Sequence, residues 1–196
     1  MRVFDKEQHL RKKEEIMKAC FNCYAEYGLN NVGIKVLGKA CGIASGSLYT
    51  YFKDLDDLIV QSTAYCMSKV EDEFMALAPK DPADVLRFID EVPYWTAREH
   101  GKKYRLMYQV YTNPKYLEYG KKFFEGVNER YTAYAKLLEP KIGIPQDVIV
   151  SLIFILIRAC VHYAMFEDEY YLKAQIETVK LAVKLFTEKY KKTNGN

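Results

Sequence analysis

The chain has 196 residues, of which 49% are hydrophobic and 28% are charged. That balance is typical of a soluble globular protein with one large or two small domains, and it excludes a disordered chain. Mean hydropathy is −0.25 and the N-terminal stretch Met1–Lys13 is polar, so we expect no secretory signal and a cytoplasmic protein.

The positive charge is concentrated in the first quarter of the chain. Residues 1–53 carry nine Lys and Arg against five Asp and Glu, whereas residues 54–196 carry twenty against twenty-one. A basic start followed by a near-neutral body indicates a nucleic-acid-binding domain at 1–53 and a second domain at 54–196. A helix over 54–77 is expected to link the two.

Helices are predicted throughout, because strand alternation is missing and Gly and Pro recur at intervals of about one helix. The predicted fold class is therefore all-α, with about nine helices. In chain order they cover about 9–27, 34–41, 45–52, 54–77, 83–98, 102–111, 113–139, 145–167 and 172–190. Gly28 is expected to end the first helix, Asp54 to cap the fourth and Pro93 to kink the fifth.

The cysteines are predicted to be core residues. There are five, an odd number in a chain without an export signal, which argues against a disulfide framework. Cys20 and Cys23 form a C-x-x-C, for which zinc or redox chemistry is the alternative, but no second cysteine or histidine pair with ligand spacing accompanies it. On a helix these two thiols lie among apolar residues, so we expect core packing and no metal.

The stretch from Gly28 to Leu58 predicts a helix-turn-helix. Two short helices are separated by a turn at Gly42, and the second can enter the major groove of DNA. Hydroxyls and small side chains there allow close approach to phosphates and base edges. The candidate DNA contacts are Lys35, Lys39, Ser45, Gly46, Ser47, Tyr49, Thr50, Tyr51 and Lys53.

Leu48 and Phe52 are expected to face inward and hold the second helix. The alternative is a helical hairpin used only for packing, but it leaves Tyr49, Tyr51 and Lys53 without a role. A basic N-terminal arm could reach a neighbouring groove, or its charges could simply be solvated. The arm residues are Arg2, Lys6, Arg11, Lys12 and Lys13.

The run ACGIASGSLYTYFKDLDDL over 40–58 resembles the signature of TetR/AcrR-type transcriptional regulators, approximately A-G-V-S-x-G-T-L-Y-x-Y-F-x-x-K-x-x-L. The run IMKACFNCYAEYG over 16–28 resembles the first helix of that family. The resemblance covers about residues 10–60. The matching residues of the signature are Gly42, Ile43, Gly46, Ser47, Leu48, Tyr49, Tyr51, Phe52 and Leu58.

Two departures from the family pattern concern helix caps. Val32 and Gly33 stand where the family usually has threonines that cap the second helix and contact phosphate. Glycine is an acceptable cap, but the hydroxyl contact is lost. Ala44 occupies the usual serine position, and Ser45 is the candidate to take over that cap.

A third departure concerns charge. Leu55 replaces a lysine that commonly contacts a DNA phosphate in the family. It lies between Asp54 and Asp56, whose negative charges would repel the DNA phosphates. Together the departures predict weaker nonspecific binding or, at the limit, a domain that no longer binds DNA.

The last two helices are predicted to form a dimer interface. The ninth has apolar residues in a heptad-like pattern, and the eighth is apolar on nearly every face, as a helix buried on all sides would be. A membrane span is disfavoured because Arg158 and His162 lie inside the eighth helix. The resemblance implies a four-helix interface between two copies. The candidate interface residues are Ile176, Val179, Val183 and Phe186.

Aromatic residues concentrate in the middle of the chain, as in a core or in a cavity for a flat or amphipathic molecule. The candidate ligand contacts are Trp95, Tyr104, Tyr108, Tyr111, Phe123, Tyr131, Arg158 and His162. Arg158 must be paired if it is buried, and three partners are open: a carboxylate of its own chain, a group across the dimer axis, or an anionic ligand.

The expected function follows from the resemblance. It implies a homodimeric, ligand-responsive, sequence-specific transcriptional regulator, a repressor released from a palindromic double-stranded DNA operator by an unidentified small molecule. No cofactor, metal or membrane is expected. An enzyme is not expected, because His100 and His162 lack catalytic spacing and there is no Gly-rich phosphate loop. The alternative is a helical ligand-binding or interaction dimer that has lost DNA binding.

Overall fold

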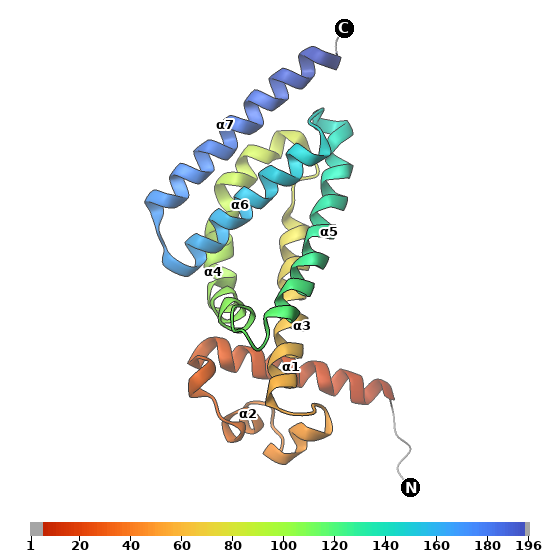
Figure 1. Ribbon diagram of the computed structural model, residues 1–196, viewed down its shortest axis with the longest axis vertical. Helices are drawn as coiled ribbons and strands as arrows, with labels where there is room; N and C mark the ends of the chain where they lie inside the picture. The colour runs from red at the N-terminus through yellow and green to blue at the C-terminus, as the bar shows by residue number, and fades with distance from the viewer. Residues whose placement is uncertain (1–5, 195–196) are drawn as a thin grey trace. The chain divides into compact units, whose positions relative to one another are not determined.

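The computed structural model describes residues 6–194, and within that range it is helical, with no strand (Figure 1). The predicted all-α class is confirmed. The α-helices are α1 (Lys6–Tyr27), α2 (Ile34–Ala40), α3 (Leu55–Leu77), α4 (Val85–Tyr111), α5 (Leu117–Ile142), α6 (Gln146–Phe166) and α7 (Glu169–Asn194). The short 3-10 segments are η1 (Leu29–Asn31), η2 (Ser45–Thr50) and η3 (Pro82–Asp84).

Helix boundaries differ from the predicted ones at several places; the helix predicted over 113–139, for example, begins at Leu117 and runs through Pro140 to Ile142. The helices expected over 83–98 and 102–111 are one continuous helix, α4, which runs through Pro93 and Gly101. One glycine in a helix costs only about 1 kcal/mol relative to alanine, and the buried side chains of Met107 and Val110 beyond it favour continuation. The second helix of the predicted helix-turn-helix is a 3-10 segment, η2, rather than an α-helix.

The chain forms two compact units. The N-terminal unit comprises Met1–Asp72 and Arg105–Lys121, and the C-terminal unit comprises Glu73–Tyr104 and Lys122–Asn196. Helices α3, α4 and α5 therefore each contribute residues to both units.

The N-terminal unit is built on the apolar face of α1. Ile16, Cys20 and Phe21 are almost fully buried there, and Leu48 and Phe52 are buried against the same interior, as predicted. Cys20 and Cys23 are core residues, and within residues 6–194 no group of three metal-ligating side chains is found. Burial of these side chains gives the short η2 segment a fixed position on α1, although six residues could not form a stable helix alone.

Gly38 lets α2 and η2 pack together closely. A Cβ atom at this position would lie 2.9 Å from the Ser45 Oγ and 3.0 Å from both the Ile43 carbonyl oxygen and the Ser45 Cα. Two of these three atoms belong to the backbone and cannot rotate away. The turn between the helices therefore requires glycine at position 38.

The segment 105–121 is held to the start of α3 by polar contacts. The Lys115 Nζ lies 2.5 Å from the Asp56 Oδ2, and the Tyr116 hydroxyl donates a hydrogen bond to the Asp56 Oδ1. These hydrogen bonds, first from Lys115 and then from Tyr116, lower the pKa of the Asp56 carboxyl. Burial and the hydrogen bond to Asp56 raise the pKa of Tyr116 to about 12, so its hydroxyl stays protonated.

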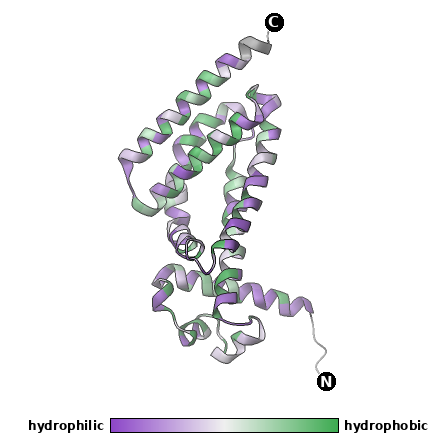
Figure 2. Cartoon of the chain, in the orientation of Figure 1, coloured by the Kyte–Doolittle hydropathy of each residue, from purple (hydrophilic) through white to green (hydrophobic). Residues whose placement is uncertain are grey.

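The C-terminal unit has its main core between α3, α4, α5, α6 and α7. Helix α6 is the most apolar, as Figure 2 shows, and it packs along α7. By length and composition alone it could cross a membrane, a test that core helices of soluble proteins also pass. The buried residues of this core are Phe74, Ile89, Val92, Val127, Tyr131, Leu156, Ala159, Cys160, Leu172, Ile176 and Val179.

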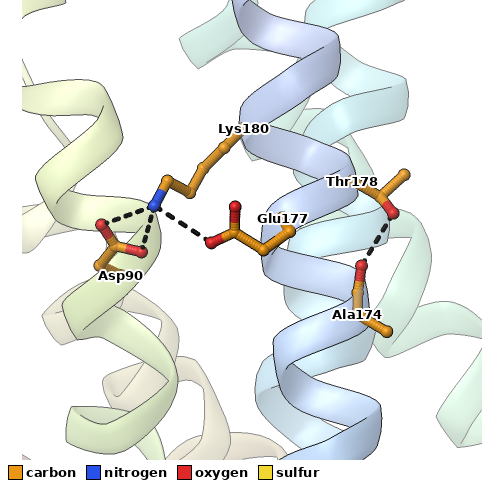
Figure 3. A network of polar contacts seen from close by, with 5 residues as sticks. All are labelled: Asp90, Ala174, Glu177, Thr178 and Lys180. Carbon is orange, nitrogen blue, oxygen red and sulfur yellow. Dashed lines mark hydrogen bonds and ion pairs between the residues drawn. The ribbon is translucent and has the colours of Figure 1, made fainter.

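A polar network fastens α7 to α4 at the edge of this core. The Lys180 Nζ donates to both carboxylate oxygens of Asp90, at 3.0 and 3.1 Å, and to the Glu177 Oε1 at 3.3 Å (Figure 3). Two residues before Lys180, the Thr178 hydroxyl donates to the Ala174 carbonyl oxygen, so its hydrogen bond is made within α7. The ammonium group shared by two carboxylates sets the position of α7 along α4.

The predicted dimer seam needs a correction. Ile176 and Val179 are only 5% and 2% exposed, because they pack into the core of their own unit, and Val183 and Phe186 are half-buried against it. A second, exposed stripe lies one or two positions earlier along α7: Tyr171, Ala174, Thr178, Leu181 and Leu185. Two stripes with heptad-like spacing therefore run side by side on this helix.

Helix α6 is also not buried on all sides. Ser151, Phe154, Ile155 and Arg158 are exposed on one face of it, and Phe166 is exposed at its end. Arg158 is therefore exposed in the protomer. Its burial could be completed only by another molecule on this face.

We expect Gly38→Ala to destabilise the N-terminal unit by about 1–3 kcal/mol, the usual cost of overpacking, despite the better helix propensity of alanine. Chemical unfolding followed by circular dichroism measures the change. Gly33→Ala is the matched control, since a Cβ at Gly33 meets no atom within 4 Å. Equal stability of the two variants would contradict the packing argument.

Asp56→Asn should reduce stability at neutral pH by about 1 kcal/mol or less, since the Lys115 partner is exposed. Because the folded-state pKa of Asp56 is lowered, its contribution is fully present above the unfolded pKa, near 4, and is lost as pH falls through the folded value. Urea unfolding of both proteins between pH 7 and pH 2 should show the difference shrinking below about pH 4. A difference that stays constant over this range would show that the carboxylate charge is not its source.

Candidate nucleic-acid interface

The turn between α2 and η2 is made by two short backbone features. Gly42 has φ +65°, a left-handed conformation that glycine adopts at little cost, and Ala44 is extended before η2 begins. The Ile43 amide donates to the Gly38 carbonyl oxygen at 3.0 Å, which closes the turn. This local geometry leaves one face of η2 exposed to solvent.

The caps of both short helices lack side-chain hydrogen bonds. Gly33 precedes α2 in an extended conformation and leaves its first amides uncapped by any side chain. Ala44 precedes η2, and Ser45 does not take over as its cap, because Ser45 is already the first residue of the helix. In contrast, Asp54 caps α3 as predicted, since its Oδ1 accepts from the Asp57 amide at 2.8 Å.

Six of the nine predicted DNA contacts are exposed, and the other three are half-buried. Tyr49 projects from η2 with 51% of its surface exposed. Lys35, Lys39 and Lys53 are exposed, and within residues 6–194 none of the three forms an ion pair. Three exposed ammonium groups and a phenol hydroxyl on one helix-turn-helix can bind phosphate oxygens and base edges. The exposed residues are Lys35, Lys39, Gly46, Tyr49, Thr50 and Lys53, and the half-buried ones are Ser45, Ser47 and Tyr51.

Tyr51 is held in place by α1 rather than projecting freely. Its ring stacks on that of His9, with centroids 4.6 Å apart. The neighbouring Thr50 hydroxyl donates to the Ser47 carbonyl oxygen at 2.6 Å. His9 was missed by sequence reasoning, because a contact between residues 42 positions apart leaves no local pattern.

The basic arm is largely engaged within α1. Arg11 pairs with Glu7 at 2.5 Å and Lys12 with Glu15 at 2.9 Å, and the Lys13 Nζ lies 5.0 Å from the centre of the Phe52 ring. Lys6 is exposed, and Arg2 lies outside the described residues. The arm therefore offers less free positive charge than its sequence suggests.

The carboxylate of Asp57, close to Lys53 in the chain, accepts hydrogen bonds from neighbouring residues. The Asp57 Oδ2 accepts from the Lys53 amide at 3.0 Å, and its Oδ1 accepts from Gln61 at 2.6 Å. Burial opposes ionisation of Asp57, but these hydrogen bonds outweigh it and lower the pKa of the carboxyl. Leu55 is half-buried at the first position of α3.

The predicted ligand contacts are not gathered in one place. Tyr108 and Tyr111 belong to the N-terminal unit and the other six to the C-terminal unit. Tyr131 is a core residue, edge-to-face with Phe74, and His162 lies against Tyr171, with ring centroids 4.0 Å apart. Only Trp95 lines the groove described next.

The C-terminal unit has a groove of about 470 Å³ and beside it a smaller apolar cavity of about 80 Å³. The groove is lined by apolar and charged groups, among them Trp95, Arg87 and Glu91. The cavity is lined almost wholly by aliphatic side chains of α4, α5, α6 and α7. Pro79 and Phe88 line both spaces and form their shared wall.

Residues 16–61 match the model of a family described as bacterial regulatory proteins, tetR family. Among curated relatives, the uncharacterized HTH-type transcriptional regulator YerO of Bacillus subtilis (strain 168) is 26% identical over 158 residues, 79% of this chain and 55% of that protein. The HTH-type transcriptional regulator AcrR of Shigella flexneri is 28% identical over 87 residues, 43% of this chain and 40% of that protein. The chain thus spans about half the length or less of these curated relatives.

The fold is shared over nearly the whole chain. The crystal structure of a TetR transcription regulator from Haloarcula marismortui ATCC 43049 superimposes with a TM-score of 0.69 at 19% identity, covering 90% of this chain and 98% of that one. The matched helix-turn-helix, the curated relatives and the common fold agree. Residues 16–61 therefore carry a tetR-family domain, and the fold of the chain resembles that of a TetR transcription regulator.

Proposed function

We propose that this protein is a sequence-specific DNA-binding transcriptional regulator that contacts its operator through η2 and α2. The observation that carries the proposal is that the same helix-turn-helix exposes three lysines without ion pairs, Lys35, Lys39 and Lys53, together with the ring of Tyr49. Lysines without protein partners release counterions on binding phosphate, and side chains on η2 read base edges in the major groove.

We further propose that the regulator is a homodimer joined through the outward faces of α6 and α7. These faces expose Ile155 and Phe154 on α6 and Leu181 and Leu185 on α7, an unusually apolar surface for two adjacent helices. A two-fold pair of such faces is self-complementary, and two DNA-binding units related by that axis fit a palindromic operator. Arg158 lies on the same face of α6.

The small molecule that we propose as effector is amphipathic. The apolar cavity would receive a short hydrophobic part, while Arg87, Lys80 and Glu91 in the adjacent groove offer partners for a polar part. Displacement of Phe88, which lines both spaces, would join them. The protein would then act in the cytoplasm as a repressor that loses its operator on binding this effector, because α3 and α4 contribute to both units.

Lys53→Ala should weaken binding to the DNA upstream of its own gene and reduce the slope of log K against log salt by about one, as loss of one phosphate contact does. Tyr49→Ala should weaken binding as well. Neither change should lower the melting temperature much, since both side chains are exposed. Gel shifts repeated across salt concentrations measure both effects.

Lys136→Ala is the matched control, because it removes the same charge from an exposed position on α5. Equal binding by all three variants and the unmodified protein would contradict the proposed interface. Failure of the unmodified protein to bind any DNA would favour the alternative, a helical ligand-binding dimer without DNA binding. The features that favour this alternative are the missing side-chain cap of α2 and the leucine at position 55.

Leu181→Glu should convert the dimer to a monomer, because a carboxylate buried at the interface would have no partner of opposite charge. The protomer should stay folded, because Leu181 is 57% exposed in it. Sedimentation measures the mass. Leu137→Glu, on α5 with 68% of the side chain exposed, should leave the dimer intact. A dimeric Leu181→Glu protein would place the interface elsewhere.

A further inference from the structure

Two cysteines of the N-terminal unit lie face to face. The Sγ atoms of Cys20, in the middle of α1, and Cys41, directly after α2, are 3.4 Å apart. A disulfide bond is about 2.05 Å long, so the two sulfur atoms would have to approach by only about 1.4 Å to form one. Cys20 is fully buried and Cys41 is half-buried, so Cys41 is the less shielded residue of the pair.

We propose that Cys20 and Cys41 are an oxidation site that reacts with a hydroperoxide and closes to a reversible disulfide between α1 and the end of α2. This goes beyond the proposed function, since it assigns a chemical modification to the DNA-binding unit. The C-x-x-C pattern points to Cys23 as the partner of Cys20, but the structure places the sulfur of Cys41 against it instead.

The surroundings of the two thiols give them different roles. The hydrogen bond from Cys20 and the positive charge of Lys12 lower the pKa of the Cys41 thiol, against the effect of its partial burial. The same hydrogen bond and burial raise the pKa of Cys20, which keeps its proton. Cys41 is therefore the nucleophile, because the thiolate and not the thiol attacks peroxides.

The reaction has two balanced steps. The Cys41 thiolate attacks one oxygen of the hydroperoxide, an S–O bond forms, the O–O bond breaks, and an alcohol leaves after taking up a proton; Cys41 is now a sulfenic acid. The Cys20 sulfur then attacks the Cys41 sulfur, the S–S bond forms, the S–O bond breaks, and water leaves with the Cys20 proton. The two thiols together lose two electrons, and the hydroperoxide gains them.

The disulfide would disturb the helix-turn-helix. Drawing Cys41 toward α1 moves the end of α2, and the tight contact of Gly38 with Ser45 and Ile43 transmits that shift to the start of η2. Since five of the nine candidate DNA contacts lie on η2, oxidation should weaken operator binding. This consequence rests on the proposed function, whereas the oxidation site itself does not.

The crosslink is tested with a matched pair of full-length variants, Cys23→Ala and Cys20→Ala. Tryptic cleavage leaves Cys20 and Cys23 on one peptide and Cys41 on another, so the pair is needed to identify the partner. After treatment with tert-butyl hydroperoxide and alkylation, Cys23→Ala should yield the crosslinked peptides, reversibly with dithiothreitol. Cys20→Ala should yield none and should accumulate a Cys41 sulfenic acid that a 1,3-diketone traps.

A crosslink in Cys20→Ala, or full alkylation of Cys41 in peroxide-treated Cys23→Ala, would overturn the proposal. Gel shifts of reduced and oxidised Cys23→Ala then test the consequence: affinity should fall at least about tenfold, the loss expected of one good base contact. Equal affinity of the two forms would overturn the coupling to η2. A reduced protein that binds no DNA would contradict the proposed function, while the crosslink result would stand.

Discussion

The candidate nucleic-acid interface depends on one steric constraint, the absence of a side chain at Gly38. Without a Cβ there, the end of α2 comes within van der Waals distance of the backbone of Ile43 and Ser45, and η2 begins where it can be fixed on α1 by Leu48 and Phe52. A six-residue 3-10 segment has little stability of its own. Its position, and with it the position of the lysine and tyrosine side chains, comes entirely from this packing.

The same packing places a reactive thiol pair beneath the interface. Cys41 directly follows α2, and its sulfur lies 3.4 Å from that of Cys20 on the buried side of α1. A change of about 1 Å between these sulfurs is small for a loop but large for a close-packed contact, because packed interiors deform little. The DNA-binding unit thus combines a rigid presentation of charge with a site at which oxidation can perturb it.

The C-terminal unit contains helices that are too apolar for one protomer to bury completely. Helix α6 covers the core with one face and leaves Phe154 and Ile155 outside, while α7 buries Ile176 and is fastened to α4 by Lys180 and Asp90. An exposed apolar face on two adjacent helices favours a partner of the same kind. The apolar cavity lies between α4, α5, α6 and α7, and the groove beside it is lined by the end of α3, the turn that follows and α4.

Local periodicity and turn chemistry were enough to predict the all-α class, the helix-turn-helix, the inward direction of Leu48 and Phe52 and the cap at Asp54. The sequence alone could not decide which of two stripes on α7 faces the core, since both have heptad-like spacing and only packing against α6 distinguishes them. Nor could it pair Cys20 with Cys41 or His9 with Tyr51, or show that Arg158 is exposed in the protomer. These contacts join residues far apart in the chain, and they exist only once the helices are packed.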